Sequence, residues 1–240
     1  MSEAGAQERI SGYWNRYAHA YDTHQRDRQA EPGVAETWSR VWRSALPPAP
    51  AAVLDVGTGS GNVALLLAHL GYRVTGIDLA EQMLAEAQGK ANGDNPPTFA
   101  LADAADPPFE PGEFDAITAR YSLWTLRDPV TALERWARLL KPGGVVVAVD
   151  SPWFPEGIGE GETQRERDFR AAYSPDVVAR LPLAEAADIH QTALVLKQAG
   201  FVDVAVEELP EIYDIDSRYG VAPGHKPQMQ YLIKARVDKG

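Results

Sequence analysis

One short glycine-rich segment carries the residues of this chain that point most directly to chemistry. The apolar run Val53-Leu54-Asp55-Val56 leads into Gly57-Thr58-Gly59-Ser60-Gly61. This pattern predicts a buried strand that turns sharply into a helix. Glycine lets a ligand approach the main chain closely. In an open α/β sheet such a turn lies at the carboxyl ends of the strands, where ligands bind. The segment therefore predicts a small-molecule site.

Three of the predicted strands end in an aspartate, namely Asp55, Asp78 and Asp103. Asp78 follows the glycine turn by about twenty residues, a spacing at which a carboxylate can accept both ribose hydroxyls of an adenosine. Asp103 could accept from the adenine amino group. Each has a structural alternative, because Asp78 could cap a helix that begins at Ala80 and Asp103 could cap a loop.

The spacing of the glycines separates two classes of ligand. A dinucleotide site favours G-x-G-x-x-G, which brings a helix N-terminus to the pyrophosphate. Here Gly61 comes one residue early, and Asp55 stands two residues before the first glycine. An acid beside the loop repels a pyrophosphate and suits an ammonium or sulfonium group. The pattern favours a ligand that joins adenosine to a positive charge, with a nicotinamide cofactor as the alternative.

Further residues could remove a proton or line a pocket. The candidates for proton removal or substrate orientation are His19, Tyr121, His190 and His225. The alternative for each histidine is a structural or exposed position. Aromatic residues that could form an apolar wall or a cation-binding face are Tyr13, Tyr121, Trp124, Trp153, Phe154 and Tyr213. Core packing is the alternative for these aromatic side chains.

The first 50 residues precede the predicted sheet and contain some of the candidate side chains. They are predicted to be helical, and Pro47-Pro48-Ala49-Pro50 ends the region because proline cannot continue a helix. Tyr13, Tyr17 and Tyr21 are spaced by four and lie on one helix face. This stripe either packs the helix onto the domain or covers a ligand.

From residue 51 onward strands and helices alternate. The expected strands are 51–56, 73–78, 98–102, 114–119 and 145–149, followed by a closing antiparallel pair at 202–207 and 230–237. The expected helices are 62–70, 80–91, 129–140 and 184–199. We predict an α/β fold with a doubly wound, mostly parallel seven-stranded sheet that is Rossmann-like. The whole chain, 1–240, forms one domain: a helical cover (1–50), a ligand-binding core (51–150), an insertion that acts as a substrate lid (151–183) and a closing part (184–240).

Composition limits the class of protein. The chain has 240 residues, no cysteine and a net charge of −11. Disulfides and thiolate chemistry are therefore excluded, and nucleic acid or an anionic membrane is disfavoured as a partner because both are held by Lys and Arg. No apolar run is long enough to span a membrane, and no apolar segment near Met1 suggests a signal peptide. We expect a soluble cytoplasmic protein, either a monomer or a homodimer, that acts on a small molecule.

The segment from Asp55 to Gly61 resembles the first motif of the class I S-adenosylmethionine-dependent methyltransferases, in their small-molecule branch. Asp78 matches their ribose-binding acid, and Asp103 with Ala104 their adenine-binding step. Leu139-Leu140-Lys141-Pro142-Gly143-Gly144 resembles the turn before their fifth strand, and 17–22 their N-terminal cover helix. The resemblance covers about residues 51–150 and the closing strands.

The resemblance implies S-adenosyl-L-methionine as cofactor and assigns roles. The region of Gly57 would meet the methionine end, with Asp55 supporting the loop, and Ala119 to Tyr121 would pass near the sulfonium. The cofactor-binding set implied in this way is Tyr17, Tyr21, Asp55, Gly57, Thr58, Gly59, Gly61, Asp78, Leu79, Met83, Asp103, Ala104, Ala119 and Arg120.

The residues after the fourth predicted strand differ from those of two related methyltransferase groups, and this limits the class of acceptor. Families that methylate adenine or glutamine amides carry an acid or Asn followed by Pro-Pro and an aromatic residue after the fourth strand. This chain has Ala119-Arg120-Tyr121-Ser122 there. The segment also lacks the aspartate that metal-assisted catechol methyltransferases place at this point. We therefore expect no metal. The predicted function is methyl transfer to N, O or C of a metabolite, for example a secondary-metabolite intermediate. The alternatives are an NAD(P)-dependent oxidoreductase and a non-methylating relative that keeps the cofactor.

Overall fold

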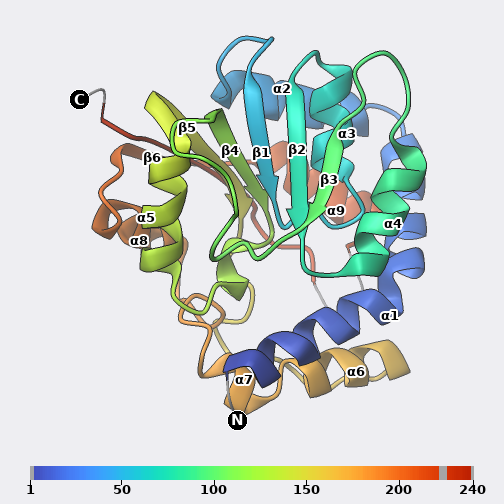
Figure 1. Cartoon of the computed structure of the whole chain (residues 1–240). Helices are drawn as coiled ribbons and strands as arrows, with labels where there is room; N and C mark the ends of the chain where they lie inside the picture. The colour runs from blue at the N-terminus through green and yellow to red at the C-terminus, as the bar shows by residue number, and fades with distance from the viewer. Residues whose placement is uncertain (1–2, 222–225, 239–240) are drawn as a thin grey trace.

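A seven-stranded sheet forms the centre of the molecule (Figure 1). The computed structural model describes residues 3–221 and 226–238. The strand order is β3-β2-β1-β4-β5-β7-β6. The strands are β1 (Ala52–Val56), β2 (Arg73–Asp78), β3 (Thr98–Leu101), β4 (Phe114–Arg120), β5 (Leu140–Asp150), β6 (Val202–Glu208) and β7 (Tyr231–Arg236). The first five strands are parallel, and β7 runs antiparallel to β5 and β6. The predicted fold class is confirmed.

The apolar sequence of β1 explains its central place. Val53 pairs with Val74 of β2 on one side and with Ala116 of β4 on the other. Successive side chains of a strand point to opposite faces of a sheet. Accordingly, Val53 lies in one buried cluster and Leu54 in the other. Both faces of the strand are covered, and the glycine turn follows directly from its buried end.

Helices cover both faces of the sheet (Figure 1). On one face, α2 (Val34–Ala45), α3 (Asn62–His69) and α9 (Pro210–Tyr219) pack with Val53. On the other, α5 (Pro129–Leu139) and α8 (His190–Gln198) pack with Leu54. The helix α4 (Glu81–Lys90) contacts β2 and β3. The shorter elements are η1 (Leu123–Thr125), α6 (Gln164–Ala172) and α7 (Pro175–Val178).

The longest helix, α1 (Glu3–Ala30), lies across the carboxyl ends of the strands, beside α6 and α7 (Figure 1). Polar contacts hold it there from two sides. The Asp22 carboxylate accepts from Lys90 of α4, and the Tyr17 hydroxyl donates to Asp168 of α6 at 2.7 Å. Trp14 donates to the Tyr173 hydroxyl at 3.0 Å. The helix that closes the site is thus attached to both neighbouring helices.

Several elements differ from the sequence prediction, among them the unpredicted η1 and α7. The helix expected over 184–199 begins only at His190, because residues 182–189 form turns and Asp188 accepts from the His190 backbone N–H at 2.8 Å. The helix α9 was not predicted, although Pro210 stands in its first turn, where proline is favoured. The strand β5 begins at Leu140, earlier than expected, because Leu140 pairs with Phe114 across an irregularity in the ladder.

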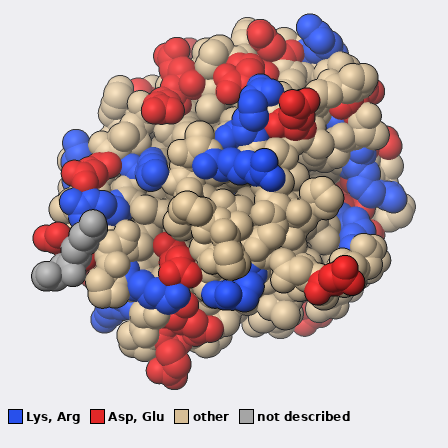
Figure 2. Space-filling view, turned by 90° about the horizontal axis from the view of Figure 1, so that it is seen from above, with Lys and Arg blue, Asp and Glu red and all other residues tan. Residues whose placement is uncertain are grey.

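Charge on the face opposite α1 is mixed. Figure 2 shows Lys and Arg among Asp and Glu there, separated by uncharged surface. Within the described part of the chain, no helix combines the length and the apolar character needed to cross a membrane.

Candidate functional site

A cavity of about 180 Å³ lies between the carboxyl ends of the strands and α1. The glycine turn and the ends of β2 and β3 form one part of its wall, and aromatic side chains form another. Twelve residues named from the sequence lie in this wall: Tyr21, Gly57, Gly59, Asp78, Leu79, Met83, Asp103, Ala104, Arg120, Tyr121, Trp124 and Trp153.

The glycine turn brings backbone to the cavity surface. Gly57 has φ +66°, and a Cβ there would lie 2.7 Å from Cβ of Ser122. Gly59 has φ +54°, and a Cβ there would meet no atom within 4 Å. Glycine at 57 therefore lets the turn pack against the segment after β4, and Gly59 presents its main chain to open space.

Asp55 lies behind the turn and not in the cavity. It is 1% exposed, and it accepts from the Thr58 hydroxyl at 2.6 Å and the Thr118 hydroxyl at 2.8 Å. Burial raises the pKa of its carboxyl to about 6, although both hydrogen bonds favour the charged form. Asp55 thus ties the turn to β4, which is the supporting role that the resemblance implies.

Asp78 is hydrogen-bonded to the backbone on both sides of the cavity wall and does not cap α4, whose N-cap residue is Ala80. One carboxylate oxygen accepts from the Gly59 N–H and the other from the Ala80 N–H, each at 2.8 Å. Burial raises the pKa of this carboxyl, and the backbone N–H groups of Ala80 and Gly59 oppose the shift. Each carboxylate oxygen has two lone pairs, so Asp78 can fix the turn and still accept from a ligand in the cavity.

Asp103 is held in place at the end of β3. Its carboxylate accepts from the Ala105 N–H at 2.8 Å and pairs with Arg127 at 3.1 Å. Trp136 of α5 donates to the Ala104 carbonyl at 2.7 Å. The segment Asp103-Ala104, which would contact an adenine, is therefore held in place by a core residue of α5.

Charged groups from three distant segments gather elsewhere in the wall. Arg28 of α1 pairs with Asp216 of α9, and both are almost fully buried. Burial raises the pKa of Asp216, while Arg28 and Arg120 oppose this. The Arg120 guanidinium lies 5.1 Å from the Trp38 ring and 5.3 Å from the Tyr121 ring, within cation–π range.

Tyr121 has two unusual features at this place. Its φ is +61°, which is rare for a residue with a side chain. Its hydroxyl is buried without a hydrogen-bond partner, and burial raises its pKa. Strained backbone of this kind concentrates at ligand sites.

Several residues named from the sequence lie outside the cavity wall. Thr58 is turned to Asp55, and Ala119 is 1% exposed within the sheet. A Cβ on Gly61 would lie 2.9 Å from Ala87, so this glycine serves the packing of α3 on α4. Tyr17 bonds Asp168, Tyr13 and Phe154 pack with Phe169, and Tyr213 is 39% exposed on α9.

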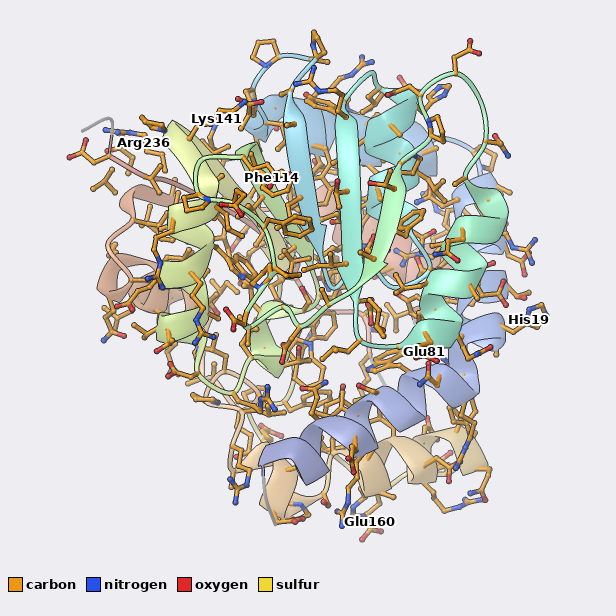
Figure 3. All side chains as sticks on the ribbon, in the orientation of Figure 1. His19, Glu81, Phe114, Lys141, Glu160 and Arg236 are labelled. Atoms are coloured by element: carbon orange, nitrogen blue, oxygen red, sulfur yellow. The ribbon has the colours of Figure 1, made fainter. Side chains whose placement is uncertain are left out.

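The histidine candidates are also placed elsewhere. His19 pairs with Glu86 at 3.0 Å and points outward from α1 (Figure 3). His190 is exposed at the start of α8, and His225 lies outside the described residues. Of the four candidates, Tyr121 is the one that the described structure places in the wall.

Sequence reasoning missed a stripe of α1 and the pair formed by Arg28 and Asp216. Apart from Tyr21, which the sequence had indicated, the wall residues of α1 are Gln7, Ile10, Ser11, Trp14, Gln25 and Arg28. Their spacing of three, four or seven matches one helix face, and this signal could have found them. Nothing in the sequence pairs Arg28 with Asp216, because they are 188 residues apart. The described residues contain no cluster of three or more His, Cys, Asp or Glu side chains placed to hold a metal.

Comparison with known proteins agrees with this geometry. Residues 54–148 match the family model described as a methyltransferase domain. Over 139 residues the chain is 32% identical to a demethylmenaquinone methyltransferase of Clavibacter sepedonicus, which covers 58% of this chain and 56% of that protein. Over 116 residues it is 40% identical to the demethylmenaquinone methyltransferase of Thermus thermophilus, covering 47% and 53%. The chain therefore spans about half the length of the curated relatives it matches.

A solved structure extends the likeness in fold. Phosphoethanolamine N-methyltransferase 2 of Haemonchus contortus, in complex with S-adenosyl-L-methionine, aligns with a TM-score of 0.62 at 20% identity, covering 85% of this chain and 52% of that one. The matched segment, residues 54–148, contains the glycine turn and the acidic residues Asp55 and Asp78. The seven-stranded sheet agrees with this match. Residues 54–148 of the chain therefore match a methyltransferase domain, and the chain shares the fold of a solved S-adenosylmethionine-binding methyltransferase.

Proposed function

We propose that this protein transfers the methyl group of S-adenosyl-L-methionine to N, O or C of a small organic acceptor. One observation carries the proposal: a single cavity joins the turn at Gly57 and Gly59, with Asp78, to a wall of aromatic side chains. A donor bound at the first part and an acceptor at the second would share one space under α1.

The residues present suit this cofactor. The free lone pairs of Asp78 can accept two ribose hydroxyls, and Leu79 and Met83 offer apolar surface for adenine beside Asp103. The open main chain at Gly59 admits close approach. When bound, the cofactor would supply an electrophilic methyl group on a sulfonium, with a neutral thioether as the leaving group.

The protein contributes mainly alignment and exclusion of water. Positioning of two reactants can supply roughly 7–11 kcal/mol of the barrier. The helix α1 covers the cavity and is attached to α4 and α6. The buried hydroxyl of Tyr121 is the candidate to orient an acceptor. We include residues 151–183, which contribute Trp153 to the wall, as a substrate lid.

The nature of the acceptor is supported less directly. The two relatives are named for demethylmenaquinone, so a ring compound of that kind is a reasonable first acceptor to assay. The net charge of −11 favours a small molecule over nucleic acid. A secondary-metabolite intermediate as acceptor stays a prediction, as does the choice between monomer and homodimer.

The proposal is tested by incubating the protein with S-adenosyl-L-methionine and a panel of phenol, amine and demethylated quinone acceptors, and measuring S-adenosylhomocysteine by mass spectrometry. We expect product that depends on one acceptor class. Cofactor binding without product from any acceptor would indicate the non-methylating alternative. Binding of NADH in place of S-adenosylhomocysteine would indicate the oxidoreductase.

A further inference from the structure

Two guanidinium groups line the cavity near the glycine turn. Arg120 ends β4, beside the end of β1, from which the turn follows. Arg28 reaches the cavity wall from α1. Burial raises the pKa of the Tyr121 hydroxyl, and the Asp216 carboxylate adds to this rise, whereas both guanidiniums oppose it. These four side chains therefore lie close together, and we call them the arginine corner.

The arginine corner holds more donors than its own acceptors satisfy. A terminal nitrogen of Arg28 donates to Asp216, and both side chains are almost fully buried. The Nε of Arg28 and the hydroxyl of Tyr121 are buried without a hydrogen-bond partner. Buried donors in folded proteins are nearly always paired, because an unpaired one is unfavourable. The surplus of donors indicates that this corner receives an acceptor group from a ligand.

Arg120 is the donor that a ligand can reach most directly. Its side chain is only half-buried, and its guanidinium packs on the rings of Trp38 and Tyr121. It donates to the side-chain carbonyl of Gln25 at 3.4 Å. Within the part of the chain that the structure describes, no carboxylate lies within ion-pair distance of it. A guanidinium has five N–H donors, and one carboxylate can accept two of them in parallel. Arg120 therefore keeps donors for a ligand.

The charges limit the kind of anion that fits the arginine corner. Arg28 is paired with Asp216, so Arg120 supplies a positive charge beyond that pair. Asp55, behind the turn, also interacts with this charge, but its two oxygens accept from threonine hydroxyls. A singly charged, planar carboxylate matches one free guanidinium. A doubly charged phosphate would add excess negative charge beside Asp55 and Asp78, which is unfavourable.

We propose that Arg120, supported by the charge of Arg28, binds a carboxylate group of a ligand in the cavity beside the glycine turn. Two ligands could carry this group: the cofactor, through its amino-acid part, or an acceptor that is itself an acid. The residues named above for the ribose and the adenine include no positive charge, so a carboxylate on either ligand needs a separate partner. This proposal rests on the proposed function, since it assigns a ligand group to the same cavity.

The first arm of the test examines the cofactor as the source. The full chain is titrated by calorimetry at pH 7 with S-adenosylhomocysteine and with 5′-(3-aminopropylthio)-5′-deoxyadenosine, which is the same molecule without its carboxylate. If the cofactor supplies the group, S-adenosylhomocysteine should bind roughly 10- to 100-fold more tightly. Arg120→Gln should bring the two affinities close together. Arg120→Lys should keep part of the difference, because the charge stays while the bidentate geometry is lost.

The second arm examines the acceptor as the source. The chain is saturated with S-adenosylhomocysteine and titrated with benzoate and with benzamide, which has a similar shape and no charge. If the acceptor supplies the group, benzoate should bind about tenfold more tightly than benzamide, and Arg120→Gln should remove the difference. If the cofactor supplies it, the site is already filled and benzoate should show no preference.

Further variants locate the preference in the arginine corner. Arg28→Gln combined with Asp216→Asn removes both members of the buried pair, so that neither charge is left alone. This double variant should reduce the same preference by a smaller factor. Arg218→Gln is the matched control, because Arg218 of α9 also packs over a tyrosine ring but lies outside the cavity wall. Equal loss in Arg218→Gln would contradict the assignment. Melting temperature is measured for each variant.

Failure of this proposal and of the proposed function are distinguishable. If S-adenosylhomocysteine and its decarboxylated counterpart both fail to bind, the proposed function fails. If they bind equally and benzoate shows no preference, only the carboxylate site fails. A preference that Arg120→Gln leaves unchanged would also overturn the site. Should Arg120→Gln not fold, Arg120→Lys and the double variant decide in its place.

Discussion

At the scale of single residues, Asp78 links the main chain of the turn to the cavity. Its carboxylate accepts from the N–H groups of Gly59 and Ala80. Removing it would leave two part-buried backbone donors and the ribose hydroxyls unpaired, and such losses cost about 1–3 kcal/mol each. We expect Asp78→Ala to weaken S-adenosylhomocysteine binding by roughly 10- to 100-fold, as measured by isothermal titration.

The control for this change is Asp106→Ala. Asp106 lies nearby with a side chain that is 72% exposed, and it is not part of the cavity wall. Its removal should leave the dissociation constant unchanged. An unaltered constant for Asp78→Ala would refute the ribose role.

Asp150 makes stability depend on pH. It is buried at the end of β5, accepts from Trp153, and has a pKa raised to about 7 by burial. Between about pH 4 and pH 7 the folded protein holds a proton that the unfolded chain has released. Stability from this group is therefore fully present at low pH and falls as the pH rises through about 7.

We expect the free energy of unfolding to drop more between pH 5 and pH 8 in the unaltered protein than in Asp150→Asn, by on the order of 2 kcal/mol. Other titrating groups are common to both proteins and cancel in this difference. Urea denaturation at the two pH values measures it. Equal drops would show that the Asp150 carboxyl is not held protonated.

At the scale of elements, α1 is the cover of the site. It carries Trp14, Tyr21, Gln25 and Arg28 into the wall, so a ligand bound beneath it must add to its stability. A ligand at 100 times its dissociation constant stabilises the binding-competent state by about 2.7 kcal/mol. We expect amides of α1 between Gly12 and Arg28 to exchange up to roughly 100-fold more slowly with S-adenosylhomocysteine bound.

Hydrogen exchange with mass spectrometry provides this measurement, and α5 is the internal control. The helix α5 packs on the sheet face and contributes no residue to the cavity wall. Its outer amides should be unaffected. Protection in α5 without protection in α1 would contradict the covering role of α1.

The elements also show what sequence can predict. Strands such as β2 were predicted to the residue, because a short segment with the β-branched residues Val74, Thr75 and Ile77 between Gly71 and Asp78 favours a strand. The tyrosine stripe was ambiguous, and its members divide: Tyr13 packs on Phe169 and Tyr21 faces the cavity. Periodicity identifies a helix face, whereas the partner of that face depends on tertiary structure.

At the scale of the whole molecule, topology explains which site residues could be foreseen. Parallel strands bring their carboxyl ends to one edge, so Gly57, Asp78 and Asp103 could be grouped from the sequence alone. Arg28 and Asp216 come from a cover helix and an unpredicted helix, and their meeting depends on how both dock. The residues proposed to bind the cofactor can be predicted from the strand order, whereas those of the rest of the wall depend on how the helices pack.

Parallel calorimetric titrations with S-adenosylhomocysteine and NADH show whether this cavity holds S-adenosyl-L-methionine. We expect saturable binding of one equivalent of S-adenosylhomocysteine, weakened in Asp78→Ala, and no binding of NADH. Absence of S-adenosylhomocysteine binding at millimolar ligand, or tighter binding of NADH, would contradict this assignment.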